Sequence, residues 1–231
     1  MLTTYIMSFS DEYIENLYNT KVKLPPSYFT KYNPLPECPI RAMNYTWSFH
    51  DYPRNWATLD FIEWTKKYGI SQVESLGYTS NDDFELEFVS AKKSTYLPYP
   101  QYDLHTIGSK FTNEFDMFLF NQTIEHLYNP FDAMKQIYSI VKPGGYVFTS
   151  VPTINIPHST PFHYNGYNPM GLAMLFRTAN FDVVEIGQWG NYEYLAKLFG
   201  SHQWPGYSHL SSHENEECNV CQCWILARKP V

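Results

Sequence analysis

The clearest pattern of apolar and polar positions lies between Phe115 and Pro152. Residues 115–120 form a nearly continuous apolar run, which predicts a parallel strand covered on both faces. Apolar residues at three- and four-residue spacing then predict a helix over residues 130–141, ended by Lys-Pro-Gly-Gly. Residues 146–151 are predicted as the next strand. These three predictions give a strand–helix–strand unit. Its first strand is expected to be buried at the centre of a sheet.

Upstream of this stretch the pattern is weaker but has the same alternation. Residues 56–68 predict a helix, and residues 71–77 predict a short strand that ends at Gly77. A helix is expected to begin at Asn81, because Asp82, Asp83 and Glu85 would occupy its first turn. Residues 92–96 predict another strand.

Downstream, Asn168 and Pro169 supply a cap and a favoured first residue for a helix that runs to about Asn180. Residues 181–186 and 221–227 predict two late strands, joined by the irregular connection 187–219. Alternating strands and helices indicate a parallel sheet covered on both sides. Ligands of such sheets bind at the carboxyl ends of the strands, here after Leu76, Tyr96, Phe120 and Val151.

The first 54 residues differ from the rest, since they carry six prolines and little sustained periodicity. We expect residues 1–54 to form an extended arm packed on a domain of residues 55–231. Within the arm, Ser10 could cap a short helix over residues 11–18, whose first turn is acidic.

Composition narrows the class of protein. Apolar residues make up 44% of the 231 positions and charged residues 17%, as in a folded globular chain. A formal net charge of -7 argues against a nucleic-acid partner. No apolar run is long enough to span a membrane, and the N-terminus lacks the features of a signal peptide, so a cytoplasmic protein without a membrane partner is expected. The four cysteines are expected to be reduced thiols.

Three pieces in order carry a family resemblance: residues 115–120, the Gln-Thr-Ile-Glu-His-Leu of residues 122–127, and the Val-Lys-Pro-Gly-Gly of residues 141–145. Together they resemble the class I S-adenosylmethionine-dependent methyltransferases of the small-molecule type. Segments from His163 to Pro230 look like the branch found beside polysaccharide biosynthesis genes. The resemblance implies an α/β Rossmann-like doubly wound sheet, mostly parallel with an antiparallel last strand, and helices on both faces. It implies methyl transfer from S-adenosylmethionine to a hydroxyl or amine of a sugar or nucleotide-sugar in glycan biosynthesis.

The resemblance also implies which residues bind the cofactor. The family's glycine-rich turn corresponds to Leu76, Gly77 and Tyr78, although the Gly-x-Gly-x-Gly pattern is absent here. An acidic ribose-binding residue near Tyr96 is missing as well. For Gly77 the alternative is a plain surface turn. The resemblance implies further cofactor contacts beside the adenine from Asp103 and Leu104, with a solvated loop residue as the alternative for Asp103. It implies contacts beside the methionine part from Asn121 and Gln122, with a loop cap as the alternative.

Three histidines compete for the role of the base that removes a proton from an acceptor hydroxyl. His158 is slightly favoured over His126 and His163, because a loop after the fifth strand lies near the expected acceptor pocket. Hydrogen bonding within the loop is the alternative for each. Three residues are candidates for the acceptor side, with core packing as the alternative for the tryptophan: Glu125, Trp189 and Asn191.

The C-terminal histidines and cysteines do not favour a metal site, since Cys221 and Cys223 fall within the predicted last strand. No metal is therefore expected. Two other functions stay open: methylation of a different small metabolite, and a binding module that has kept the fold but lost the cofactor turn.

Overall fold

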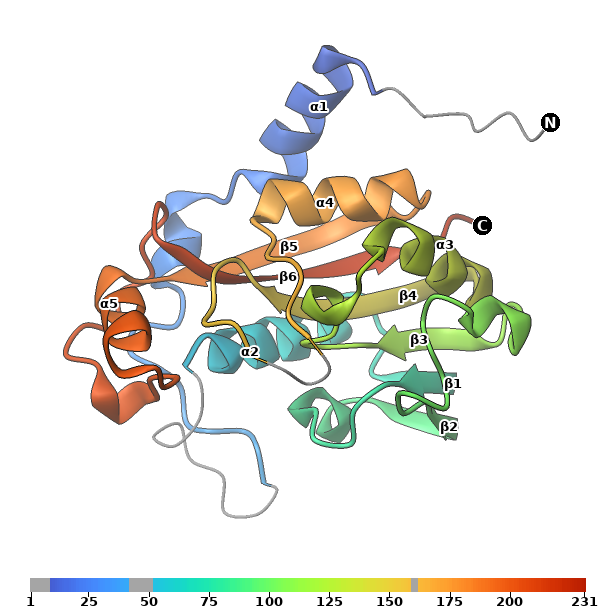
Figure 1. Ribbon diagram of the computed structural model, residues 1–231, viewed down its shortest axis with the longest axis horizontal. Helices are drawn as coiled ribbons and strands as arrows, with labels where there is room; N and C mark the ends of the chain where they lie inside the picture. The colour runs from blue at the N-terminus through green and yellow to red at the C-terminus, as the bar shows by residue number, and fades with distance from the viewer. Residues whose placement is uncertain (1–8, 42–51, 159–161) are drawn as a thin grey trace.

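A computed structural model describes residues 9–41, 52–158 and 162–231 (Figure 1). Its helices are α1 (Asp11–Leu17), α2 (Tyr52–Lys67), α3 (Pro130–Ile140), α4 (Pro169–Thr178) and α5 (Tyr192–Ser201). Its strands are β1 (Gln72–Tyr78), β2 (Ser90–Tyr96), β3 (Phe115–Leu119), β4 (Val141–Pro152), β5 (Asp182–Gly190) and β6 (Val220–Arg228). Short 3₁₀ segments include η4 (Phe84–Glu87), η5 (Ile107–Ser109) and η6 (Ile124–His126).

All six strands form one sheet in the order β2-β1-β3-β4-β6-β5. Every neighbouring pair is parallel except the two pairs that β6 makes with β4 and β5. The chain passes from β1 outward to β2 and then returns to β3 on the other side of β1. This reversal is a topological switch point, and open α/β sheets bind their ligands in the crevice that it creates.

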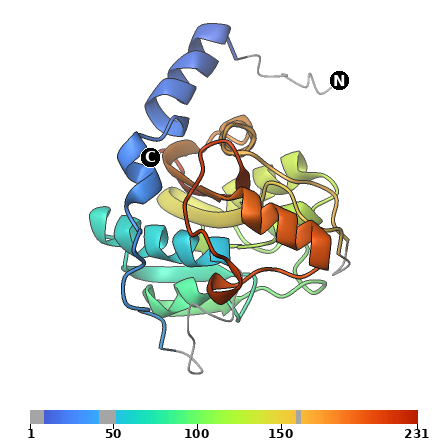
Figure 2. The same cartoon turned by 90° about the vertical axis from the view of Figure 1, so that its left-hand side faces the viewer.

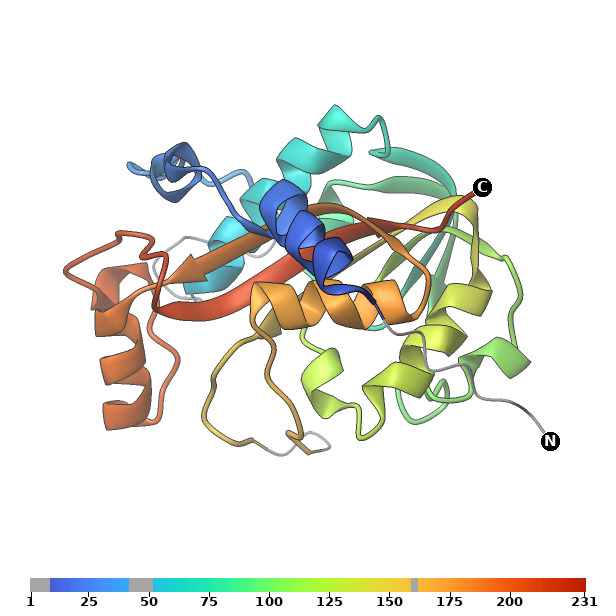
Figure 3. The same cartoon turned by 90° about the horizontal axis from the view of Figure 1, so that it is seen from above.

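Two apolar clusters cover the two faces of the sheet. Seen from above, α3 and α4 lie on one side and α2 on the other (Figure 3). The first cluster packs the apolar stripe of α3 on Phe118, and the second packs Phe61 of α2 on Phe148, with ring centroids 4.7 Å apart. The expected Rossmann-like doubly wound sheet with an antiparallel last strand is confirmed.

Most predicted elements are confirmed within a few residues, including α1, which Ser10 caps by accepting from the Tyr13 backbone N–H at 3.2 Å. The helix predicted from Asn81 is wrong, because this connection contains only the 3₁₀ turn η4. Residues 79–89 are too few for a helical crossover between parallel strands. The connection predicted to be irregular contains α5, whose N-cap is Asn191.

The described part of the arm lies against the domain. Figure 2 shows α1 projecting beyond the sheet, and the turn that follows it contacts β5. Farther along, Tyr28, Lys31 and Tyr32 all reach the carboxylate of Asp60 on α2. None of the described helices is long and apolar enough to cross a membrane.

Candidate functional site

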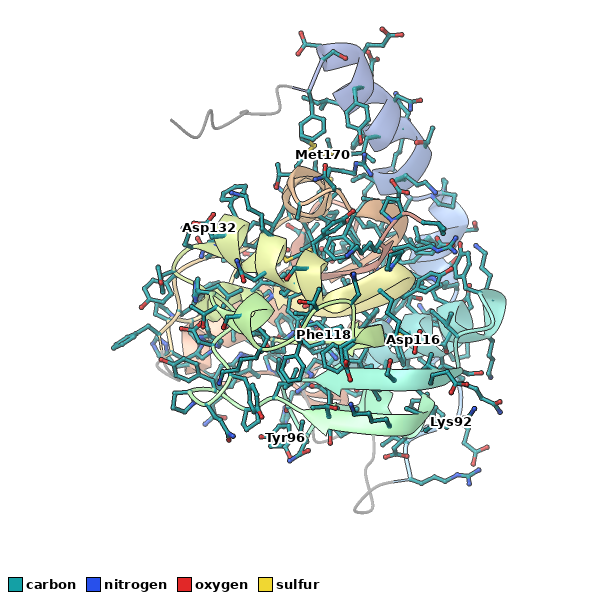
Figure 4. The ribbon with its side chains drawn as sticks, turned by 90° about the vertical axis from the view of Figure 1, so that its right-hand side faces the viewer. Lys92, Tyr96, Asp116, Phe118, Asp132 and Met170 are labelled. Carbon is teal, nitrogen blue, oxygen red and sulfur yellow. The ribbon has the colours of Figure 1, made fainter. Side chains whose placement is uncertain are left out.

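A cleft of about 800 Å³ opens at the carboxyl ends of β1, β2 and β3, which is the switch point of the sheet. The loops that follow these three strands form most of its wall, and Arg54 from the first turn of α2 completes it. Figure 4 shows Tyr96 and Lys92 at opposite ends of β2, with Tyr96 at the end that borders the cleft.

The residues predicted for the glycine-rich turn do not line the cleft. Gly77 lies within β1, and a Cβ placed on it would come within 2.8 Å of the ring of Phe118. Leu76 is buried in the core, and Tyr78 stacks on Tyr96 with centroids 5.5 Å apart. The small residue at position 77 therefore accommodates the packing of β3. The first cleft residues after β1 are instead Thr79 and Ser80.

Asp103 and Leu104 line the cleft, as the resemblance implies for the adenine side. The Asn129 backbone N–H donates to Nε2 of His105 at 3.3 Å, so Nδ1 of this ring carries the proton. Nδ1 therefore donates to one oxygen of Asp103 at 2.7 Å. The His105 ring also stacks on Tyr128 at 4.0 Å. This arrangement orients Asp103 through one carboxylate oxygen.

Asn121 and Gln122 follow β3 and also line the cleft. The side-chain oxygen of Asn121 accepts from the Ser150 backbone N–H at 2.9 Å, while its buried Nδ2 makes no hydrogen bond within the described residues. Gln122 adopts a φ of 48° and donates through Nε2 to the Ser150 hydroxyl at 3.0 Å. The link to β4 fixes both side chains at the edge of the sheet.

Two buried carboxylates, Asp83 and Glu85, lie beside this edge in the β1–β2 connection. Burial raises the pKa of both well above the usual range, and the charge of Arg54 only partly opposes it. Arg54 lies 3.6 Å from one oxygen of Asp83, and Thr58 donates to one oxygen of Glu85. The second oxygen of each carboxylate makes no hydrogen bond to any described residue.

Sequence reasoning missed Arg54 and Asp83 as cleft residues. The sequence places Arg54 in the arm, and its approach to the loop after β1 is a tertiary contact without a local pattern. The sequence predicts Asp83 in the first turn of a helix. One sequence feature indicates Asp83 as a cleft residue: the acidic segment Asn81-Asp82-Asp83 closely follows a strand that ends at the switch point, where such sheets bind ligands.

The three candidate bases gather at one end of the cleft. The rings of His126 and His158 are 4.9 Å apart, and Nδ1 of His158 is 3.3 Å from Nδ1 of His163. Burial lowers the pKa of His126 and of His163, and the neighbouring His158 lowers both further. His126 borders the cleft directly, whereas His158 and His163 line a shallow pocket beside it that shares Phe162 and Tyr164 with the cleft.

Glu125 is 1% exposed and lies beneath the histidines. Its Oε1 is 3.9 Å from Nε2 of His126, and its Oε2 makes no hydrogen bond within the described chain. Burial raises the pKa of Glu125 to about 8. The backbone carbonyl of Glu125 accepts from the N–H groups of Tyr164 and Asn165, which attaches the histidine loop to η6.

The structure does not bring Trp189 and Asn191 to the cleft. Trp189 is fully buried, with its ring 4.9 Å from Tyr52 and 5.5 Å from Tyr194. Asn191 caps α5 by accepting from the Tyr194 backbone N–H at 3.0 Å, and donates to the carbonyl of Glu214. Both residues contribute to the packing around α5.

Comparison with known proteins identifies the family. A family model described as a methyltransferase domain matches residues 30–186, more than half of the chain. No match was found among curated proteins.

Solved structures share the fold at low identity. The [4+2]-cyclase SpnF is 14% identical, covers 97% of this chain and 98% of its own, and has a TM-score of 0.50. A putative methyltransferase from Bacillus halodurans is 14% identical over 74% of this chain and 99% of its own, with a TM-score of 0.49. The 1,6-didemethyltoxoflavin-N1-methyltransferase of Burkholderia thailandensis is 14% identical, covers 76% of this chain and 79% of its own, and has a TM-score of 0.49.

Identities of this size show the fold alone, so the family assignment depends on the matching model together with the sheet described above. The chain belongs to the methyltransferase-domain family and is a class I methyltransferase that uses S-adenosylmethionine.

Proposed function

We propose that this methyltransferase acts on a hydroxyl or amine of a sugar or nucleotide-sugar in glycan biosynthesis, within the cleft at the switch point. The observation that carries the proposal is that a single cleft joins two kinds of residue. Open polar groups for a zwitterionic cofactor lie on its floor, and proton-accepting histidines lie at its end.

The floor of the cleft fits the amino-acid end of S-adenosylmethionine, which carries an ammonium and a carboxylate. Asp83 has a buried oxygen that can accept from the ammonium, and the side-chain amide of Asn121, which faces the carboxyl groups of Asp83 and Glu85, can donate to the carboxylate. Arg54 adds a positive charge beside them. Buried polar groups without partners are rare in folded proteins, so these open positions favour a ligand with both charges.

The opposite wall fits the adenosine end. Asp103 is oriented through one oxygen by His105, and its other carboxylate oxygen provides an acceptor for an amino group. Leu104, Tyr99 and Tyr102 add apolar and aromatic surface in the same part of the wall. We place the cofactor's adenine on these residues, in place of contacts from Leu76, Gly77 and Tyr78.

When bound, the cofactor supplies an electrophilic methyl group for an in-line displacement. The chain then has to align the acceptor, keep water out and take up the proton of a hydroxyl. Because the pKa of His126 and of His163 is lowered, both rings are neutral near pH 7 and have a nitrogen available as a proton acceptor. The cluster His126, His158 and His163 is thus the proposed base. Glu125 is buried beneath it and does not line the cleft, so its contact with an acceptor stays a prediction.

The aromatic rim beside this cluster supports a sugar as the acceptor. Phe162 and Tyr164 are large exposed aromatic side chains that line both the cleft and the adjoining pocket of His158 and His163. Their flat, largely uncharged faces suit a sugar ring better than a strongly charged metabolite. Another small metabolite is the alternative acceptor, because acceptor loops vary freely on this fold.

The test is methyl transfer from S-adenosylmethionine to a panel of sugars and nucleotide-sugars, with small amines and phenols as comparison acceptors. Formation of S-adenosylhomocysteine is measured together with the mass of the methylated product. We expect a methylated sugar, and a strong loss of turnover in His158→Ala or His126→Ala but not in the surface control His202→Ala. Turnover restricted to non-sugar acceptors would reject the sugar.

A second candidate, the binding module without methyl transfer, is favoured by the missing glycine pattern after β1. Isothermal titration with S-adenosylhomocysteine separates the two candidates. One equivalent of binding supports the enzyme, and absence of binding at millimolar concentration supports the module.

A further inference from the structure

Glu125, His126 and His158 form a cluster whose geometry resembles that of a metal site. One carboxylate oxygen and one ring nitrogen from each histidine all lie within 4.8 Å of one another. The three residues come from two loops that the hydrogen bonds from Tyr164 and Asn165 to the Glu125 carbonyl hold together. No motif in the sequence indicated this set, since His158 is 32 positions after His126.

Hydrogen bonds set the tautomers of both histidines in the form that a metal requires. Nδ1 of His126 lies 2.7 Å from the Phe162 carbonyl, and Nδ1 of His158 lies 3.1 Å from the Ile156 carbonyl. A carbonyl only accepts, so Nδ1 carries the proton in each ring and Nε2 keeps its lone pair. Metal-binding histidines typically donate their other ring N–H to such a backbone carbonyl.

Glu125 provides a second, independent observation. The side chain is 1% exposed, and its Oε2 is buried without a hydrogen-bond partner among the described residues. A buried carboxylate without a partner is costly unless a cation compensates it. A divalent cation between the three side chains would give this carboxylate the partner that it lacks.

We propose that Glu125, His126 and His158 bind a divalent transition metal of the zinc class, with a coordination position open toward the cleft. Two imidazole nitrogens and one carboxylate are a ligand set found in catalytic zinc sites, where metal–ligand distances are about 2.0–2.2 Å. Ligand atoms around such an ion are about 3.3 Å apart. The ligand atoms now lie within 4.8 Å of one another, so metal binding requires the two loops to approach by up to about 1.5 Å.

The metal would bind the acceptor oxygen and make its proton easier to remove, as a Lewis acid does. This role rests on the proposed function, whereas metal binding by the three residues does not. His163 stays outside the ligand set, since its Nδ1 faces Nδ1 of His158 and not the free nitrogen of that ring. With the metal bound, His126 and His158 act as ligands and no longer as bases, so His163 is the member of the proposed base cluster that keeps this role.

The experiment is a titration of the full, chelator-treated chain with Zn²⁺ against a chromophoric competitor, repeated with Co²⁺ for its visible absorption spectrum. We expect one equivalent of metal in the wild type and an affinity more than about 100-fold lower in Glu125→Gln, His126→Ala and His158→Ala. Changing a residue that only hydrogen-bonds to a metal ligand typically lowers metal affinity by roughly 10–100-fold. Loss of a ligand itself should lower the affinity further. His163→Ala and the surface control His202→Ala should bind like the wild type.

Circular dichroism confirms that each variant is folded, and Glu125→Gln preserves the shape of the side chain if an alanine variant unfolds. A wild type without stoichiometric metal, or wild-type affinity in His126→Ala and His158→Ala, overturns the proposal. So does a loss in His163→Ala as large as that in His158→Ala. Metal binding without binding of S-adenosylhomocysteine would reject the proposed function and leave the metal site in place.

Discussion

Two groups of buried carboxylates in this molecule have opposite surroundings. Asp60 on α2 is fully buried and bonded at both oxygens: Tyr28 and Trp224 donate to one at 2.8 Å, while Tyr32 donates to the other, which Lys31 also pairs. Asp83 and Glu85 are nearly as buried, yet each has one oxygen without a partner in the described chain. Burial raises the pKa in both groups.

This difference in hydrogen-bond partners distinguishes a carboxylate that stabilises the fold from one that is available to bind a ligand. Asp60 joins the arm, α2 and β6, so its interactions are complete in the protein itself. Asp83 borders the cleft, and its interactions become complete only when a ligand supplies a donor. Among the described residues with a buried polar atom that lacks a partner, Asp83 and Asn121 are the ones that line the cleft, and this combination favours them as binding residues.

The largest effect is expected for Asp60→Ala. Removing one partner from a buried ionic network typically lowers the free energy of unfolding by about 3–5 kcal/mol. Urea unfolding measures the loss, and the folded protein should bind S-adenosylhomocysteine with wild-type affinity because Asp60 does not border the cleft. A loss below about 1 kcal/mol would show that Asp60 is not a structural anchor.

The next effect is a pH dependence of stability caused by Glu125. Its pKa is raised to about 8 in the folded state, so the proton that it retains stabilises the fold at low pH. That stability is lost as pH rises toward 8, by about 1.4 kcal/mol per pH unit. In the metal-free protein, Glu125→Gln should gain stability relative to the wild type between pH 6 and pH 8, by up to roughly 3 kcal/mol. A difference that stays constant with pH would contradict the raised pKa.

A smaller effect is expected for Asp83→Asn, measured by titration with S-adenosylhomocysteine. Hydrogen bonds to charged groups contribute about 1.5–3 kcal/mol, so affinity should fall by roughly 10- to 150-fold. Stability without ligand should not fall, since the variant removes a buried carboxylate that lacks a full set of partners. Unchanged affinity would place the cofactor's ammonium elsewhere.

The smallest effect is expected for Gly77→Ala, where the new methyl group would press on Phe118 and Phe115. Overpacking of this kind typically costs about 1–3 kcal/mol of stability. Gly200→Ala is the matched control, because nothing lies within 4 Å of its Cβ position in α5. Equal stability of the two variants, with a loss of cofactor affinity only in Gly77→Ala, would restore Gly77 as a cofactor contact.

Sequence patterns predicted the half of the fold that follows β3 better than the half before it. The strand β3 and the helix α3 have local signals in their apolar spacing, and the structure confirms both. The cleft residues Asp103, Asn121 and His126 are implied by the family resemblance, and Asn121 also comes directly after the strand that the apolar run locates.

The contacts that the sequence could not predict join distant segments. Arg54 reaches Asp83 across a loop whose conformation depends on α2, and His158 approaches His126 only after β4 has been placed in the sheet. No local spacing encodes such contacts. The short connection after β1 also misled the prediction, since acidic residues suited to a helix start lie in a 3₁₀ turn instead.

The most direct test of the cleft's role is a crystal structure of the chain with S-adenosylhomocysteine. We predict that the ligand's ammonium is bonded to Asp83, its carboxylate to Asn121 and Arg54, and its adenine amino group to Asp103. A ligand bound outside this cleft, with the second oxygen of Asp83 still without a partner, would contradict the assignment.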